Sequence, residues 1–300
     1  MSTGRQPETV RAYLDALQAA LKGAPPALIQ DALADAEEHL RNEIAQNPEL
    51  SESAVLESAI ENFGTPEEVA ETYRLLEESL TGPFPKSEEN RPSRFSFFGI
   101  VSDPRAYGAL VYMLLSIATG IFYFTWTVTG LSLTVGLFIL VIGIPFALLF
   151  IGSERVIAHV EGRVVETLLG VRMPRRLPPA YAERRTLFSR IGEALADIRT
   201  WSSILYLLLM LPLGVIYFVI AVVGLSLSLG IAAVSMYSLV TNQSHFSMDA
   251  LPVLDHVLHT APGLVIFALI GVLLFFVVLH VAKFIGLLHG KLAELLLVRL

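Results

Sequence analysis

The sequence contains no cysteine and only two tryptophans, and charged residues occupy only 16% of its 300 positions. Without cysteine the chain can form no disulfide, no thiolate metal site and no cysteine nucleophile. Hydrophobic residues occupy 54% of the positions, the mean hydropathy is +0.61, and several uncharged runs are longer than twenty residues. Ordinary soluble domains do not have such runs. We therefore expect an integral membrane protein.

Basic residues are missing from two long stretches, one between Arg105 and Arg155 and one between Arg199 and Lys283. The segment from Glu154 to Arg199, in contrast, contains nine arginines. The positive-inside rule then predicts that both termini and this segment face the cytoplasm, in a multi-pass protein of the inner membrane. Four spans are expected at about 106–129, 131–151, 202–224 and 263–282, with a turn near Gly130. Residues 225–240 either continue the third span or re-enter the membrane.

Acidic residues are concentrated at the start of the chain, where Met1 to Gly82 holds 16 acids against 5 bases. The N-terminus is polar and lacks the basic start and apolar run of a secretory signal. Apolar residues recur at helical spacing in four segments, beginning at Val10, at the Pro25-Pro26 pair, after Ser51 and after Thr65. Gly64 is expected to end the third helix, and Thr65 to Glu68 has the form of a capping box. This predicts a cytoplasmic helical module at residues 1–80, which we call the N-terminal module.

The remaining chain divides into a linker at residues 81–102, which contains three prolines, and a membrane domain at residues 103–300. The fold class is therefore all-α, with a soluble helical module followed by a four-helix transmembrane domain. No acidic residue falls within the four expected spans. Transporters and intramembrane enzymes usually need such a residue, so its absence disfavours both.

The membrane domain contains an internal repeat. Asp103 to Leu137 aligns without a gap with Asp197 to Ile231, 94 positions later, with fourteen identities in thirty-five positions. The matches include Asp-x-Arg, two tyrosines and three glycines, which composition alone would not place in register. Further on the offset becomes 128 and aligns Gly162 with Gly290. The membrane domain is therefore predicted to be two repeated hairpins, residues 103–171 and 197–300, and the second carries 34 extra residues.

Both hairpins are predicted to end in amphipathic extensions, at Glu154 to Gly170 and at Lys283 to Arg299. Two interpretations remain open for these extensions. They dock a protein and carry a signal, or they rest on the lipid surface, and the second interpretation is slightly favoured.

Two family resemblances follow from these motifs. The patterns YLDALQAAL, LADAEEHL and FGTPEEVAETY, within about Val10 to Arg74, resemble the HAAS family of small bacterial cytoplasmic modules. The segments DPRAYGALVYMLL and ERVIAHVEGRVVETLLGVRMP, with the repeated hairpin, resemble the bacterial putative sensor domain over about Asp103 to Leu300. The resemblance implies a sensor in which paired hairpins occur alone, beside small modules or before a kinase. No phosphoacceptor helix or ATP-binding domain is found in this sequence, so kinase activity is not carried over.

The extra residues of the second hairpin lie between about Ala232 and Ile270 on the expected outer face. They include potential proton or metal ligands, which form the candidate sensory loop: His245, Asp249, Asp255, His256 and His259. His256 and His259 would share a helix face, as metal ligands often do. Histidines and aspartates are also common in exposed loops for solubility alone, and we predict no catalytic, cofactor-binding or metal site. A contact with a ligand of unknown chemistry is the favoured interpretation.

We therefore predict an integral membrane sensor or regulatory protein in signal transduction, without catalytic activity or cofactors. Gly286 to Lys291 has one residue too few for a nucleotide-binding glycine loop. The expected partners are the lipid bilayer and a cytoplasmic protein, for instance a transcriptional regulator, and a homo-oligomer is left open. Direct binding of nucleic acid is not expected, because the arginine-rich segment is interleaved with acids and tethered to the membrane. The alternatives are an envelope structural or assembly factor and a membrane subunit of a transporter.

Overall fold

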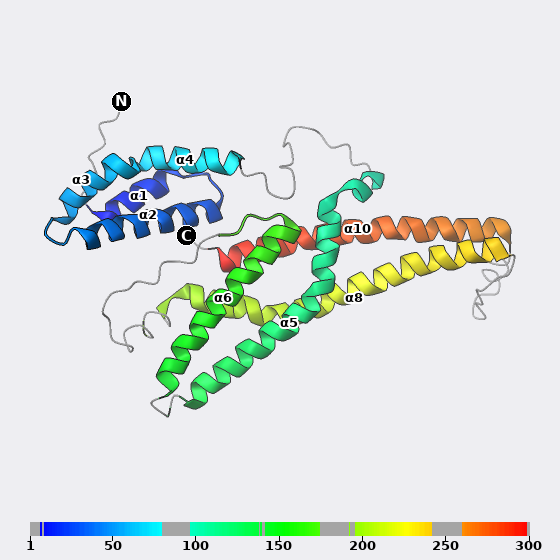
Figure 1. Cartoon of the computed structure of the whole chain (residues 1–300). Coiled ribbons are helices and arrows are strands. Elements are labelled where there is room, and N and C mark those ends of the chain that lie inside the picture. The colour runs from blue at the N-terminus through cyan, green and yellow to red at the C-terminus, as the bar shows by residue number, and fades with distance from the viewer. Residues whose placement is uncertain are drawn as a thin grey trace. The chain divides into compact units, whose positions relative to one another are not determined.

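The structure is a computed structural model. It describes residues 9–79, 97–137, 142–174, 196–241 and 260–298, together with Pro7, Ile139 and Gly192. Every element in this described part of the chain is a helix, which confirms the all-α prediction (Figure 1). Residues 81–96 of the predicted linker lie outside the described residues, which resume at Phe97.

The N-terminal module consists of four helices, as predicted: α1 (Val10–Ala20), α2 (Pro26–Gln46), α3 (Glu52–Phe63) and α4 (Pro66–Ser79). The side chains of Thr9 and Ser51 accept hydrogen bonds from the first turns of α1 and α3. These caps satisfy backbone N–H groups that have no partner inside a helix. Local sequence signals therefore set the helix starts.

The junction of α3 and α4 joins local capping to the core of the module. Gly64 ends α3 with φ +105°, a conformation that favours glycine. Thr65 and Glu68 form the predicted capping box, with hydrogen bonds of 2.9 and 3.3 Å between backbone N–H groups and side-chain oxygens. The backbone hydrogen bond from Thr65 lowers the pKa of Glu68. The hydroxyl of Tyr13 donates to the Gly64 carbonyl at 2.9 Å and so ties α1 to this junction.

The core of the N-terminal module is closed by apolar side chains from all four helices. Tyr13, Leu17 and Leu21 are fully buried, and α2 contributes Ala32 and Leu40. Burial, with smaller effects from Glu67 and Glu68, raises the pKa of the Tyr13 hydroxyl to about 12. The predicted apolar stripes therefore do meet in one core.

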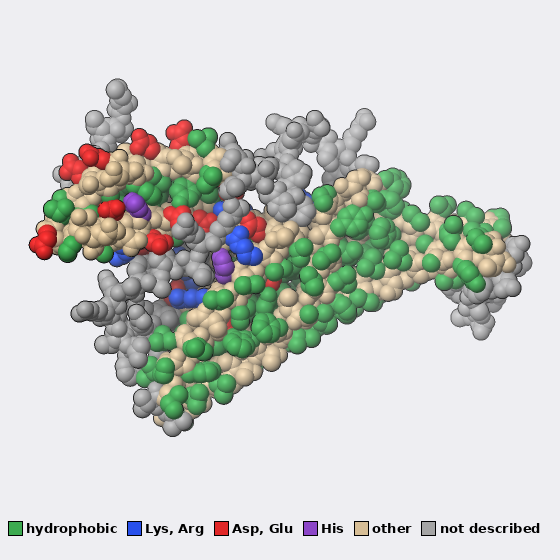
Figure 2. All heavy atoms as spheres, in the orientation of Figure 1, with side chains coloured by type: hydrophobic (Ala, Val, Ile, Leu, Met, Phe, Trp, Pro, Cys, Tyr) green, Lys and Arg blue, Asp and Glu red, His purple; other side chains and the backbone are tan. Residues whose placement is uncertain are grey.

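The membrane domain contains four helices that are long and apolar enough to cross a membrane. They are α5 (Pro104–Leu137), α6 (Gly143–Leu169), α8 (Ile198–Thr241) and α10 (Ala261–Leu297), and a 3₁₀ helix, η1 (Phe97–Ser102), precedes α5. About 20 residues suffice to cross a hydrocarbon core, and the shortest of the four, α6, has 27. Figure 2 shows hydrophobic side chains over the outer surface of these helices, and Leu149 and Leu269 are more than 60% exposed. Such an apolar surface is suited to contact with lipid.

The predicted turn near Gly130 is wrong. Gly130 lies inside α5, which continues to Leu137 before the chain leaves the helix. A Cβ atom at Gly130 would lie 2.2 Å from the ring of Phe150 on α6. This glycine therefore allows α5 and α6 to approach each other, as small residues do between membrane helices.

The extra residues of the second hairpin are largely helical. Leu137, the end of α5, aligns with Ile231, but α8 continues ten residues further to Thr241. Gly143, the start of α6, aligns with Gly271, but α10 begins ten residues earlier at Ala261. Twenty of the 34 extra residues thus lengthen the two helices, each by roughly 15 Å. Residues 225–240 continue the third span.

The chain forms two compact units. One contains residues 1–87, 130–206 and 291–300, and the other contains residues 88–129 and 207–290. The N-terminal module and α6 therefore belong to the same unit, whereas α5, α8 and α10 each contribute to both units.

Candidate functional site

The repeated Asp-x-Arg motif has the same two roles in both of its copies. One carboxylate oxygen of Asp103 accepts from the backbone N–H of Arg105 at 3.0 Å, and Asp197 accepts from Arg199 at the same distance. Each aspartate thereby caps the start of its helix. The other oxygen pairs with a base on the second helix of the other hairpin.

These two ion pairs are equivalent in the repeat alignment. Lys283 Nζ lies 2.6 Å from Asp103 Oδ2, and Arg155 Nη2 lies 3.4 Å from Asp197 Oδ2. Desolvation by burial tends to raise the pKa of Asp103, but the hydrogen bonds from Lys283 and from the Arg105 backbone, with the charges of both bases, hold that pKa below its usual value. The aspartate–base pair is therefore a structural joint that ties each hairpin to the other.

Three tyrosines of the repeat make buried contacts with Glu161 or His289, which occupy equivalent positions in the two hairpins. Tyr112 Oη lies 2.5 Å from His289 Nε2, and Tyr217 Oη lies 3.3 Å from His289 Nδ1. Tyr206 donates to Glu161 Oε1 at 3.1 Å. Glu161 aligns with His289 at the offset of 128. One hairpin thus presents an acid where the other presents an imidazole, and both side chains are almost fully buried.

Two acids of α6 lie on its buried face. Glu154 and Glu161 are buried, and both belong to the helix that runs from Gly143 to Leu169. The sequence placed both acids in an amphipathic extension, Glu154 to Gly170, that continues the second span. The helix has no break at Glu154, and its two faces differ because Glu154 and Glu161 are buried while Val156 and Val160 are exposed.

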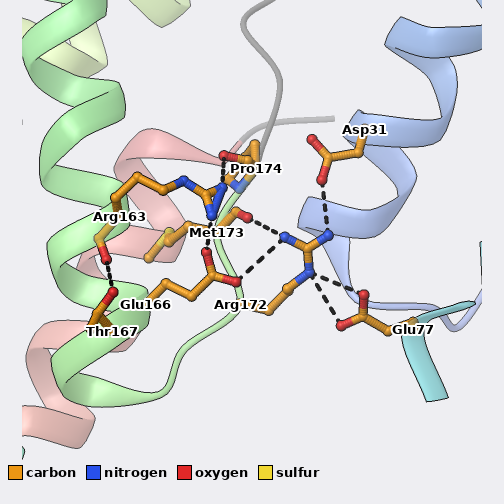
Figure 3. A network of polar contacts seen from close by, with 8 residues as sticks. All are labelled: Asp31, Glu77, Arg163, Glu166, Thr167, Arg172, Met173 and Pro174. Atoms are coloured by element: carbon orange, nitrogen blue, oxygen red, sulfur yellow. Dashed lines mark hydrogen bonds and ion pairs between the residues drawn. The ribbon is translucent and has the colours of Figure 1, made fainter. Parts of the chain in front are cut away.

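Arg172 connects the segment after α6 to the N-terminal module (Figure 3). Its Nη2 donates to Asp31 Oδ2 on α2 at 2.9 Å, and its Nε donates to Glu77 Oε2 on α4 at 3.1 Å. Its Nη1 lies 3.6 Å from Glu166 on α6 and also donates to the carbonyl of Met173. One guanidinium therefore contacts three carboxylates on three helices.

The surroundings of Arg172 make the loss of one partner more costly than it is for a surface ion pair. The side chain of Arg172 is 16% exposed and that of Asp31 only 7%. Exposed pairs contribute about 0–1 kcal/mol, whereas removing one partner of a buried pair costs about 3–5 kcal/mol because the other charge is left without compensation. Arg163 completes the network, since it pairs with Glu166 and donates to the Pro174 carbonyl at 2.9 Å. We call Asp31, Glu77, Arg163, Glu166 and Arg172 the Arg172 network.

The membrane helices match a known family. A family model described as Putative sensor matches residues 112–297, which is more than half of the chain. The chain belongs to the Putative sensor family. A second model, HAAS, matches residues 12–72. Both resemblances stated from the sequence are therefore confirmed. No curated protein and no solved structure matches the chain.

The structure does not describe the candidate sensory loop of this Sensor domain. His245, Asp249, Asp255, His256 and His259 all lie outside the described residues. Among the described residues no group of three or more His, Asp, Glu or Cys side chains could hold a metal ion.

Sequence reasoning gave no individual role to Arg172, Glu161 or His289. One signal was available for two of them. At the offset of 128 Glu161 aligns with His289, and both face a tyrosine of the other hairpin. Arg172 aligns with Leu300 at that offset, so the repeat gives no signal for its role. The three residues of the Arg172 network outside α6, Asp31, Glu77 and Arg172, are far apart in the sequence, and only the fold brings them together.

Proposed function

We propose that this protein is a non-enzymatic sensor of the cytoplasmic membrane that passes the state of its transmembrane helices to the HAAS module, and through it to a cytoplasmic protein. The matches to Sensor and HAAS fit a membrane sensor or regulatory role. The observation that carries the relay is the Arg172 network, in which Arg172 bonds two carboxylates of the module and one of α6.

The relay follows from what such a network can do. An arginine guanidinium has five N–H donors in a rigid fork, so the direction of each hydrogen bond is fixed. A small shift of α6 relative to the module would break the bonds to Asp31 and Glu77 together rather than one at a time. A ligand then shifts the equilibrium between docked and released module only by its differential affinity for the two states. The partner that binds the released module is expected to be cytoplasmic.

The first test concerns topology. If the arginine-rich segment lies inside, Pro178→Cys will resist an impermeant maleimide in intact cells, whereas Ser244→Cys will react. The absence of native cysteine means that each variant carries a single thiol. Labelling is followed by the mobility shift of the protein, with permeabilised cells as the control for reactivity. A labelled position 178 with a protected position 244 would invert the proposed orientation.

A second test concerns the signal. Residues 242–260 connect α8 and α10 and contain the candidate sensory loop. Their replacement by a short Gly-Ser linker should leave insertion intact but abolish stimulus-dependent changes in the protease sensitivity of residues 81–99. The readout is limited proteolysis of the full chain in membranes, with and without conditions that stimulate the intact protein. A variant that still responds like the wild type would show that the signal enters elsewhere.

A further inference from the structure

A pocket beside α6 is lined by side chains whose charge suits an anion. It encloses about 100 Å³ and opens among the ends of several helices. Its polar lining consists of Gln30, Arg155, His159, Asp197, Arg199 and Ser203. Two arginines and one aspartate thus line the pocket, and Arg155 already pairs with Asp197 at 3.4 Å. Small-molecule sites usually enclose at least roughly 300 Å³, so this pocket suits a small group such as a phosphate.

The pocket lies beside the first turn of α8, where the apolar part of that helix begins. Asp197 directly precedes α8, and Arg199 is the second residue of that helix. Trp201 follows, is 49% exposed and begins the apolar part of α8. Tryptophan is enriched at the level of lipid headgroups, and basic pockets between membrane helices bind anionic headgroups there.

The repeat supplies an internal comparison. The equivalent positions in the other hairpin keep the charged residues of the pocket, since Lys283, Asp103 and Arg105 align with Arg155, Asp197 and Arg199. They do not keep its neutral polar lining. Leu287 aligns with His159, and Ala109 aligns with Ser203. The charged joint between the hairpins therefore needs neither a histidine nor a serine.

The two equivalent ion pairs also differ in how closely the base approaches the aspartate. Lys283 approaches Asp103 to 2.6 Å, whereas Arg155 stays at 3.4 Å from Asp197 and also donates to Thr200 at 3.3 Å. Arg155 keeps 43% of its side chain exposed. A guanidinium that is held loosely beside a second arginine can donate two parallel hydrogen bonds to one anion.

We propose that this pocket binds the phosphate group of an anionic phospholipid, with Arg155 and Arg199 neutralising its charge and His159 and Ser203 supplying neutral hydrogen bonds. Gln30 brings helix α2 of the HAAS module to the same pocket. A headgroup in the pocket therefore touches both the Sensor domain and the HAAS module. The inference concerns a ligand class and does not depend on whether the module relays a signal.

The test uses the full chain in detergent, stripped of lipid and then supplied with phosphatidylglycerol or phosphatidylcholine. Native mass spectrometry counts the retained lipid. Wild type should retain phosphatidylglycerol in preference to phosphatidylcholine, and Arg199→Gln should weaken this retention about tenfold, as expected for one charge-assisted hydrogen bond. The matched control is Arg105→Gln, the equivalent change in the other hairpin, which should retain the lipid like the wild type.

A second variant keeps the test valid if Arg199→Gln misfolds. His159→Leu with Ser203→Ala introduces the residues that the other hairpin already carries, so the fold should accept them, and lipid retention should fall. Equilibrium dialysis with inorganic phosphate separates the two sources of the anion. Phosphate binding without lipid retention would overturn the headgroup, and no preference for phosphatidylglycerol, or an equal loss in Arg105→Gln, would overturn the site. Neither readout depends on partner binding, so a failed relay would leave this result interpretable.

Discussion

Replacing Gly120 or Gly214 by alanine is expected to destabilise the transmembrane domain strongly. A Cβ atom at Gly120 would lie 2.5 Å from the carbonyl oxygen of Met210, and one at Gly214 would lie 2.2 Å from that of Ser116. In both cases the added Cβ atom would clash with a backbone atom, so no side-chain rotation can relieve the clash. Helices α5 and α8 would have to separate.

The two contacts are reciprocal in the repeat alignment. Gly120 aligns with Gly214 and Ser116 aligns with Met210, so each glycine meets the residue four positions before the other. Separation would also break the hydrogen bond of 3.3 Å from the Ser116 hydroxyl to the Gly214 carbonyl. Overpacking costs typically about 1–3 kcal/mol, occasionally more, and we expect each variant at the upper end. The free energy of unfolding in mixed micelles, followed by circular dichroism during denaturing-detergent titration, measures this loss.

Gly136 and Gly230 provide the matched control. They are also equivalent glycines of α5 and α8, but a Cβ atom at either position meets nothing within 4 Å. Alanine there should change the free energy of unfolding by no more than about 0.5 kcal/mol, or stabilise the helix, because alanine loses less conformational entropy than glycine. A uniform loss across all four variants would mean that glycine flexibility, and not close approach, governs stability.

The N-terminal module was predictable because its signals are local. Ser51, Gly64 and the Thr65–Glu68 box each act within four residues, and all three occur where the sequence placed them. The apolar stripes needed only the helical period. What the sequence could not supply was the contact of Tyr13 with Gly64, since these residues are 51 positions apart.

The ends of the spans were not predictable in the same way. Hydropathy reports the length needed to cross a hydrocarbon core, and all four helices continue beyond it. Gly130 was interpreted as a turn, which is what glycine often indicates in soluble proteins. In a membrane helix the backbone stays hydrogen-bonded at glycine, and the small residue serves helix contact instead.

The candidate site depends on residues that meet only in three dimensions. The positive-inside analysis used the arginines as a group and gave no role to any one of them. Arg172 differs from the others because it follows Gly170, which ends α6 in the left-handed conformation at φ +72° and turns the chain away from the helix axis. That turn brings Arg172 towards Asp31 and Glu77, and no periodicity in the sequence encodes it.

Replacing Arg172 by glutamine should release the HAAS module from the Sensor domain. Asp31 would keep its buried carboxylate without the guanidinium that neutralises it, a loss of about 3–5 kcal/mol for a buried pair. The docked state would then be disfavoured by at least two orders of magnitude relative to the wild type. Glutamine preserves much of the side-chain volume, so the change removes charge and hydrogen bonds with little change in packing.

The lack of native cysteine makes the measurement direct. Cysteines replacing Glu57 on α3 and Val156 on α6, both exposed, carry spin labels in the full chain reconstituted in nanodiscs. The wild type should give one narrow distance distribution by pulsed electron resonance, and Arg172→Gln should give a broad one. Hydrogen exchange of the α2 amides supplies a second readout that does not involve labels.

Arg163→Gln is the matched control for this change. It removes the same charge from the same network, but the contacts of Arg163 are with Glu166 and Pro174. Its distance distribution should therefore remain narrow. A double variant, Asp31→Asn with Glu77→Gln, should reproduce the release by removing the opposite charges, and combining it with Arg172→Gln should add little, because residues of one network are not additive. If Arg172→Gln and Arg163→Gln broaden the distribution equally, the segment after α6 responds to charge in general, and Arg172 does not hold the module.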